Sequence, residues 1–348
     1  MNKTIQEIYD QYAALEKTVT LIEKDRDSLR TFFQNAAPSR IIAVGCGSSF
    51  LLSESIAATA SLQTGISSFA VPGGDLMLHM EQYAPLFAGK PLLLTVSRSG
   101  ATSEVLYAIR ELKGRYPALK TVCIACTNGS PIAAESDLVI EIPWAFDESV
   151  CQTRSVTNLY AASMLFIAAA TGDEATFTDY RALAAKGGQF MKDNEEALKK
   201  IGSGGFTSAA VLCDGQGAGV ASEAALAFNE IAYTPSISKH VLDVRHGPMV
   251  LLDAKTLVII KLDKDGFHYQ TDLVADILKK GAQVVVVSDE ELPAIEGAAA
   301  QIAFGEKLCG TVSAAVLLPV AQLISYYHAL VVGADPDQPD GLDAWIKL

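Results

Sequence analysis

The sequence has few basic residues for its length. Its 348 residues include 27 Lys and Arg against 40 Asp and Glu, which gives a formal net charge of -13. Because binding to a polyanion depends on clustered Lys and Arg, this balance argues against a nucleic-acid partner. It leaves open the binding of a small anion at one place on the protein.

Histidine and cysteine are also scarce, with five and six residues respectively. The cysteines lie mostly in apolar runs, so we expect reduced thiols rather than a secreted disulfide framework. Cys123 and Cys126 form a CxxC, but both fall in one expected strand, where a separation of three places them on opposite faces. No histidine pair accompanies them. We therefore expect no metal site, and no cofactor is implied.

An uninterrupted apolar segment of the kind found in signal peptides and membrane spans is missing. The segment Met1–Phe33 carries charges throughout in an amphipathic pattern and predicts a packed helix. The run Val312–Val332 is long and apolar, but it contains Pro319, Gln322 and His328, which favours a buried core helix. We expect a cytoplasmic protein without a membrane partner.

Apolar, β-branched runs alternate with helical patterns along the chain. Corresponding runs in the two halves are offset by roughly 165 residues, which indicates an internal duplication. Continuous apolar strands separated by helices predict a parallel sheet covered on both faces. The sequence thus predicts an α/β protein with two tandem doubly wound parallel sheets. The expected strands are Arg40–Val44, Leu92–Val96, Lys120–Ala125, Leu138–Ile142, Ala209–Cys213, Leu257–Lys261, Ala282–Val287 and Gln301–Phe304.

The same pattern predicts where the parts of the chain begin and end. Polar, loosely patterned segments separate the two halves, and a helical pattern bridges them. The expected parts are an N-terminal helical segment (1–34), a first domain (35–173), a connecting helix (174–202), a second domain (203–333) and a C-terminal tail (334–348).

Two hydroxyl-rich turns follow expected strands of the first half. One is Ser97-Arg98-Ser99-Gly100-Ala101-Thr102, which precedes a helical run, and the other is Gly45-Cys46-Gly47-Ser48-Ser49. Hydroxyl and backbone N–H donors at a helix N-terminus suit a phosphate, although Ser, Thr and Gly at such places also serve as ordinary helix caps. Because ligands of such sheets bind beyond the carboxyl ends of the strands, the two turns predict one anion site.

Five motifs follow one another in a set order. They are Gly45-Cys-Gly-Ser-Ser, Ser97-x-Ser-Gly-x-Thr, Ser149-Val-x-Gln-Thr-Arg, Glu223-x-Ala-Leu-x-x-x-Glu230 and His246-Gly-Pro248. With this order, nearly the whole chain resembles the sugar isomerase (SIS) domain family. It looks most like the tandem-SIS isomerase half of glutamine:fructose-6-phosphate amidotransferases, and like amino-sugar phosphate deaminases and fructosamine-phosphate deglycases. The resemblance implies two three-layer α/β/α SIS domains.

The resemblance also implies a sugar-phosphate substrate. Ser49, Ser97, Ser99 and Thr102 would hold the phosphate, and the turn from Val150 to Thr153 would face the sugar hydroxyls. Arg98 replaces an amide of the amidotransferases, and either adds a bidentate phosphate contact or faces solvent. The full set of expected substrate-binding residues is Gly47, Ser48, Ser49, Ser97, Arg98, Ser99, Thr102, Val150, Gln152, Thr153 and Glu223.

Two residues are expected to be catalytic. Interconversion of an aldose and a ketose needs one group that removes a proton beside the carbonyl and returns it to the next carbon, and we assign this role to Glu230. Glu223 lies seven residues earlier, on nearly the same helix face. A solvated helix glutamate is the ordinary alternative for both. The family motif implies that His246 opens the sugar ring and reaches the site from a neighbouring subunit, which implies a homodimer.

The chain departs from the amidotransferases at two lysines. Ala227 and Ala344 stand where those enzymes have a lysine on the glutamate helix and the Schiff-base lysine of the tail, and Lys347 is the remaining tail lysine. A substrate that already carries nitrogen needs no such lysine, which favours a deglycase or deaminase. The alternatives are a phosphosugar isomerase or aminotransferase-like enzyme with a Schiff base, and a non-catalytic sugar-phosphate sensor.

Overall fold

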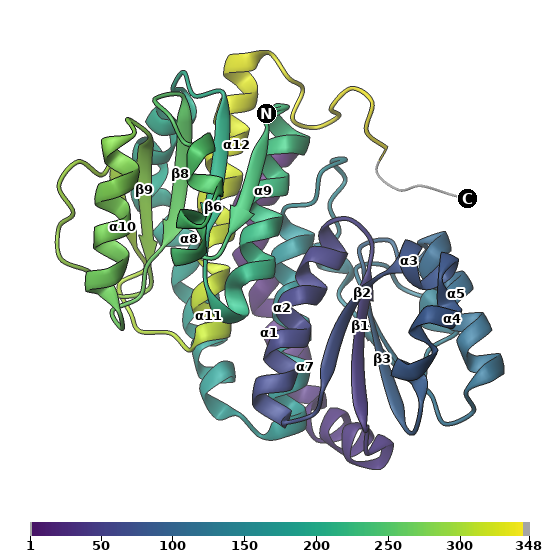
Figure 1. Ribbon diagram of the computed structural model, residues 1–348. Helices are drawn as coiled ribbons and strands as arrows, with labels where there is room; N and C mark the ends of the chain where they lie inside the picture. Colours follow the sequence, from purple (N-terminus) through teal and green to yellow (C-terminus); the bar gives the residue numbers. More distant parts are fainter. Residues whose placement is uncertain (1, 344–348) are drawn as a thin grey trace. The chain divides into compact units, whose positions relative to one another are not determined.

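The computed structural model describes residues 2–343 and divides into two compact units, each built around one sheet (Figure 1). The first-sheet unit comprises Asp10–Glu148 and Gln152–Ala185, with Asp343. The second-sheet unit comprises Met1–Tyr9, Ser149–Cys151 and Lys186–Leu342. The predicted α/β fold with two tandem parallel sheets and a long N-terminal helix is confirmed, while the finer domain boundaries stay a prediction.

The first sheet has five parallel strands in the order β2-β1-β3-β4-β5. Helices α2 and α7 pack on one face, and α3, α5 and α6 lie over the other, which makes three layers (Figure 1). The strands are β1 (Arg40–Gly45), β2 (Ser68–Pro72), β3 (Pro91–Ser97), β4 (Lys120–Ala125) and β5 (Leu138–Glu141). The helices are α1 (Lys3–Ala36), α2 (Ser48–Thr64), α3 (Gly73–Leu78), α4 (Met80–Tyr83), α5 (Ser103–Arg115), α6 (Pro131–Ala134), α7 (Arg154–Thr171) and α8 (Glu174–Gly202), with 3-10 turns η1 (Ala84–Phe87) and η2 (Pro143–Ala145).

The second sheet repeats this topology, in the order β10-β9-β8-β6-β7. Helix α9 packs on β6 and β7 and against α12, whereas α10 covers the opposite face. The strands are β6 (Ser208–Leu212), β7 (Ser236–Lys239), β8 (Thr256–Lys261), β9 (Gln283–Ser288) and β10 (Ala300–Ala303). The helices are α9 (Ala218–Ala232), α10 (Phe267–Lys279), α11 (Gly310–Ala315) and α12 (Leu317–Val332), with turns η3 (Gly215–Gly217), η4 (Leu242–Arg245) and η5 (Pro248–Leu251).

Each sheet contains one strand that the sequence analysis missed. These are the edge strands β2 and β7, of which only one residue, Val71, is fully buried. Central strands such as β3 and β8 are buried along their whole length and therefore read as continuous apolar runs. The equally exposed edge strands β5 and β10 were predicted, but serine, proline and lysine interrupt the short apolar patterns of β2 and β7, so these two segments resemble loops.

The long apolar run near the C-terminus forms buried helices. The segment Gly310–Val332 is long and apolar enough to cross a membrane, but 78% of its most apolar window is buried inside the protein. It is interrupted after Ala315, where α11 gives way to α12. The expectation of a core helix is confirmed.

All six cysteines are free, and four of them are buried. Burial raises the pKa of the Cys123 and Cys213 thiols to about 12, so both remain protonated near neutral pH. A protonated, enclosed thiol is a poor nucleophile and a poor metal ligand. These cysteines therefore act as small core residues.

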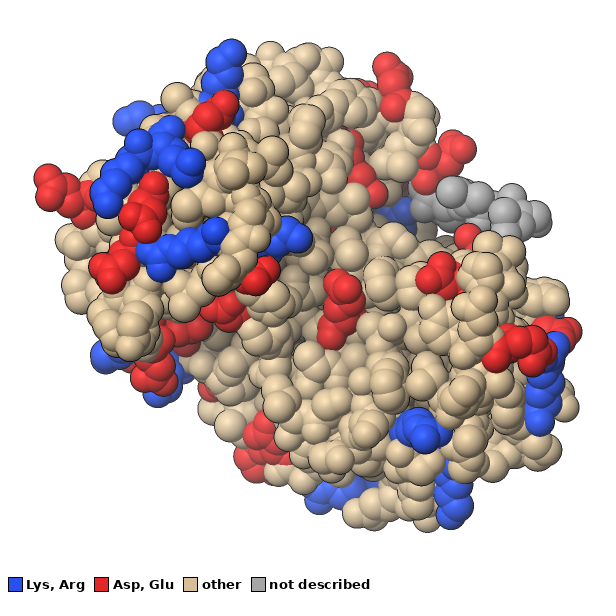
Figure 2. All heavy atoms as spheres, in the orientation of Figure 1, with Lys and Arg blue, Asp and Glu red and all other residues tan. Residues whose placement is uncertain are grey.

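Many basic side chains lie beside acidic ones. Examples within one unit are Arg110 with Glu135 at 2.8 Å and Arg245 with Asp276 at 2.6 Å. On the face drawn in Figure 2, blue side chains likewise stand among red ones. Local pairing of this kind neutralises basic groups that a polyanion would need.

His328 is a buried histidine on α12, with 2% of its surface exposed. Its Nδ1 lies 3.0 Å from the carbonyl oxygen of Gly202, and its ring stacks on Phe206 at 3.8 Å. Burial lowers the pKa of His328 below its ordinary value of 6.5, although the Gly202 carbonyl opposes this. The folded protein therefore holds the imidazole neutral, with the proton on Nδ1.

This histidine makes stability depend on pH. Because the unfolded chain binds the proton more readily, wild-type stability should fall as pH drops through and below about 6.5. His328→Gln should show a smaller fall between about pH 7.5 and about pH 5.5 in urea unfolding. His268→Gln on the exposed face of α10 is the control and should follow the wild type. Equal pH dependence in all three proteins would contradict the prediction.

Candidate active site

A hydroxyl-lined turn follows β3 and opens α5. The Oγ atoms of Ser97 and Ser99 accept hydrogen bonds from the N–H groups of Gly100 and Ala101, at 3.0 and 3.2 Å. Ser97 Oγ also lies 3.2 Å from Thr102 Oγ1. A hydroxyl that accepts a backbone N–H keeps its own proton to donate, and the N-terminus of α5 adds partial positive charge. The turn therefore has the chemistry of an anion site.

A second hydroxyl-rich turn follows β1 and opens α2. Ser48 and Ser49 begin this helix and are buried, with 5% and 4% exposure. Gly47 before them adopts a φ of 55°, which a residue with a side chain rarely takes. Strands β1 and β3 are neighbours at the point where the strand order reverses, so both turns lie at the same carboxyl edge. The structure thus brings together seven expected residues: Gly47, Ser48, Ser49, Ser97, Arg98, Ser99 and Thr102.

Gly100 fixes the shape of the first turn. Its φ is 60°, and a Cβ there would lie 2.1 Å from the Oγ of Ser130. That hydroxyl caps α6 by accepting the N–H of Ala133, and Ile132 N–H donates to the Gly100 carbonyl at 2.9 Å. The phosphate-type turn is therefore packed directly against the start of α6.

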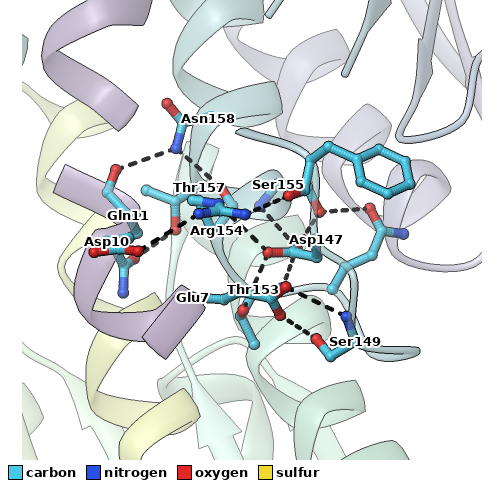
Figure 3. Close-up of polar contacts among 12 residues, drawn as sticks. Glu7, Asp10, Gln11, Asp147, Ser149, Thr153, Arg154, Ser155, Thr157 and Asn158 are labelled. Carbon is cyan, nitrogen blue, oxygen red and sulfur yellow. Dashed lines mark hydrogen bonds and ion pairs between the residues drawn. The ribbon is translucent and has the colours of Figure 1, made fainter. Parts of the chain in front are cut away.

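Asp147 organises the approach to α7 and was missed by the sequence analysis. It is 1% exposed and accepts hydrogen bonds from the N–H groups of Thr153 (2.8 Å) and Ser155 (2.9 Å) and from Ser155 Oγ (2.5 Å), as Figure 3 shows. Burial raises the pKa of Asp147, while these donors and Arg154 oppose the rise. An acidic residue next to another in an expected loop gives no sequence signal of such a role.

Two arginines of the first-sheet unit are held by protein groups. Arg98 is 5% exposed, and its guanidinium lies 5.9 Å from the centre of the Phe146 ring. Arg154 donates to the Phe146 carbonyl and lies 3.7 Å from Asp10 and 3.9 Å from Asp147. Arg98 does not face solvent, which removes one of its two expected roles.

The remaining expected residues divide between the units. Gln152 and Thr153 belong to the first-sheet unit, and Val150, Glu223, Glu230 and His246 to the second-sheet unit. Glu223 and Glu230 both lie on α9, where Glu223 is 3% exposed and Glu230 is partly buried.

His246 and the positions at which the amidotransferases carry lysine lie elsewhere in the chain. His246 lies between η4 and η5 with its side chain exposed, and Ala227 is 5% exposed on α9. The positions of Ala344 and Lys347 lie outside the described residues.

A known protein family matches most of the first-sheet unit. Residues 36–170, which contain both hydroxyl-rich turns, match the SIS domain family. This part of the chain is similar to a SIS domain. A glutamine–fructose-6-phosphate aminotransferase of Aeropyrum pernix is 26% identical over 354 residues, covering 97% of this chain and 56% of that protein. This chain therefore spans little more than half the length of that relative.

Solved structures match both SIS-type sheets. A glucosamine-6-phosphate deaminase of Thermotoga maritima is 26% identical, with a TM-score of 0.82 over 99% of this chain and 100% of that one. A tagatose-6-phosphate ketose/aldose isomerase of Escherichia coli, at 24% identity, shares the fold with a TM-score of 0.86 over 98% and 96%. The tandem SIS fold is thus common to this chain and to both enzymes.

The packing of Gly100 makes a stability prediction. Gly100→Ala forces a left-handed backbone on alanine and displaces the Ser130 cap, so we expect a loss of about 2–4 kcal/mol of unfolding free energy. Gly114→Ala is the matched control on exposed α5, where no atom lies within 4 Å of the added Cβ and stability should not fall. Denaturant unfolding measures both. Equal stability of the two variants would contradict the described packing.

Proposed function

We propose that the protein is an enzyme acting on a phosphorylated amino sugar or sugar–amine conjugate. The observation that carries this is the pair of hydroxyl-rich turns at the β1/β3 reversal point, which offers hydroxyl donors and helix N-termini to a phosphate. The similarity to a glucosamine-6-phosphate deaminase and to aminotransferases of fructose 6-phosphate supports the same substrate class. Arg98, buried beside the turn, contributes positive charge to it.

In this proposal Glu230 is the general base. For a ketosamine, its carboxylate removes a proton from C1, which gives an enaminol as the carbonyl oxygen gains a proton. The carboxylic acid then returns its proton to C2, and the nitrogen loses its own, which leaves an aldose imine. Water adds to the imine and releases aldose phosphate and free amine. Glu223, which lies about two turns earlier on α9, contacts the substrate.

His246 opens the sugar ring, and we propose that it does so in the site of a second copy of the chain. Its side chain is exposed, and the flanking Leu242, Val250 and Leu251 are 41%, 80% and 62% exposed. Apolar side chains at this density are typical of a surface that a partner covers. A homodimer would bury them and deliver the imidazole.

The deglycase or deaminase reaction is preferred over one that uses an enzyme imine. Ala344 stands in the sequence where the amidotransferases carry the Schiff-base lysine, and an alanine cannot form an imine. A substrate that brings its own nitrogen forms the imine internally. A Schiff-base isomerase and a non-catalytic sensor are the alternatives.

Binding should depend on the phosphate group. A sugar 6-phosphate should raise the melting temperature, whereas the unphosphorylated sugar should not, because only the former engages the hydroxyl-rich turns. Ser99→Ala should reduce that shift, and Ser68→Ala on the edge strand β2 is the control that should keep it. Equal stabilisation by both sugars would overturn the phosphate site.

Turnover should depend on the carboxylate of Glu230. Glu230→Gln keeps the shape but cannot accept the proton, so kcat should fall by about two to four orders of magnitude while phosphosugar binding remains. The assay is release of amine or ammonia from a panel of amino-sugar phosphates.

Two controls refine this test. Glu196→Gln, at an exposed site on α8, should keep full turnover. Mixing inactive Glu230→Gln with inactive His246→Asn should restore part of the activity if the imidazole serves a second copy. Phosphosugar binding without turnover of any panel member would favour the sensor. Near-normal turnover of Glu230→Gln would show that Glu230 is not the base.

A further inference from the structure

The start of α1 is capped by a carboxylate from the far end of the chain. Asp337 Oδ2 accepts the N–H of Lys3 and Oδ1 accepts the N–H of Thr4, both at 2.8 Å. Thr4 Oγ1 lies 2.9 Å from Asp337 Oδ1 and 2.7 Å from the Pro336 carbonyl. The first N–H groups of a helix have no partner within it, so this carboxylate supplies what the local sequence does not.

The backbone of Asp337 makes a second, separate connection. Its carbonyl accepts the N–H of Val150 at 3.0 Å, in the turn that precedes α7. Glu7 on the first turns of α1 accepts the N–H of Ser149 at 3.3 Å and its hydroxyl, the contact labelled in Figure 3. The segments 2–9, 149–151 and 334–342 therefore form one hydrogen-bonded cluster within the second-sheet unit.

The tail segment (Ala334–Leu342) also packs on α9. Ala334 and Leu342 lie against a buried cluster that contains Cys151 and the α9 residues Ala227 and Ile231. Helix α9 carries Glu223 and Glu230. The tail segment thus contacts both the Ser149–Cys151 turn and the helix of the proposed base.

We propose that Asp337 is a positioning residue: by capping α1 it fixes the tail segment, and through its carbonyl it fixes the backbone of Val150 for the sugar. The proposal rests on the proposed function, in which Val150 begins the sugar-facing turn. Asp337 touches no reacting atom. Its role is to hold Val150 and α9 in one arrangement within their unit.

The carboxylate suits this role better than an amide. Burial alone would raise the pKa of Asp337, but the N–H groups of Thr4 and Lys3 outweigh it and hold the pKa below its usual value. The residue is therefore ionised near neutral pH and accepts both N–H groups at once. An asparagine has one acceptor oxygen, so its amide nitrogen would face a backbone N–H.

The primary test is hydrogen exchange followed by mass spectrometry. Asp337→Asn should speed amide exchange in peptides covering residues 3–9 and 148–153, while β8 and β9 keep wild-type protection. Asp340→Asn is the control in the same tail, because Asp340 accepts the Tyr233 hydroxyl through its backbone carbonyl at 3.5 Å and not through its side chain. Unchanged exchange at 148–153 in Asp337→Asn would overturn the proposal, as would a rise of equal size in all peptides.

Kinetics form the second arm. Asp337→Asn should lower kcat/KM by about tenfold through displaced substrate groups, with the phosphate-dependent melting shift retained. Thr4→Val removes the hydroxyl that contacts Pro336 and Asp337 but leaves both N–H contacts. It should give a smaller effect of the same kind, and it replaces Asp337→Asn in the test if that variant does not fold. Thr4→Ser should restore wild-type values. Wild-type kcat/KM in both Asp337→Asn and Thr4→Val would refute a positioning role.

The two arms separate this proposal from the proposed function. If the wild type neither binds nor converts a phosphosugar, the proposed function fails, yet the exchange data still decide whether Asp337 orders Val150. If the wild type is active and the exchange at 148–153 is insensitive to Asp337, the function stands and the positioning role fails.

Discussion

The candidate site depends on the parallel order of the first sheet. Because β1 and β3 are neighbours while their crossover helices lie on opposite faces, the chain leaves the sheet in two directions between them. The turns after these strands therefore lie at the same edge of the sheet. A strand order that did not place β1 beside β3 would separate Ser49 from Ser97.

The second sheet repeats the topology but not the chemistry. Pro91 and Thr256 begin β3 and β8 and pair with the first residues of β1 and β6, so Lys261 stands at the place of Val96. The turn that follows is Leu262-Asp263-Lys264-Asp265-Gly266 instead of a run of hydroxyls. Lys261 is 3% exposed and lies 2.5 Å from Asp263 and 3.5 Å from Asp289. These carboxylates would repel a phosphate, so the expected anion site has no counterpart in this turn.

The sequence predicted the parts of the structure that repeat or that carry continuous burial. Eight strands, the paired sheets and the hydroxyl-rich turns follow from apolar runs and from residues adjacent in sequence. The edge strands β2 and β7 escaped because serine, proline and lysine interrupt their short apolar patterns. Asp147 and Asp337 escaped for another reason: their partners are set by the fold, and for Asp337 the partner helix starts more than 330 residues away.

Protein acceptors hold both ends of the turn before α7. The buried carboxylate of Asp147 accepts the N–H groups of Thr153 and Ser155 at the C-terminal end. At the N-terminal end, the buried carboxylate of Glu7 accepts the N–H of Ser149, and the backbone carbonyl of Asp337 accepts the N–H of Val150. A loop with so many fixed N–H groups loses little entropy when a ligand binds, because its backbone is already ordered. Buried charge is costly, so a backbone held in this way is more typical of a binding loop than of a simple connection between β5 and α7. In the proposed function, this ordered backbone would lower the entropic cost of binding the sugar.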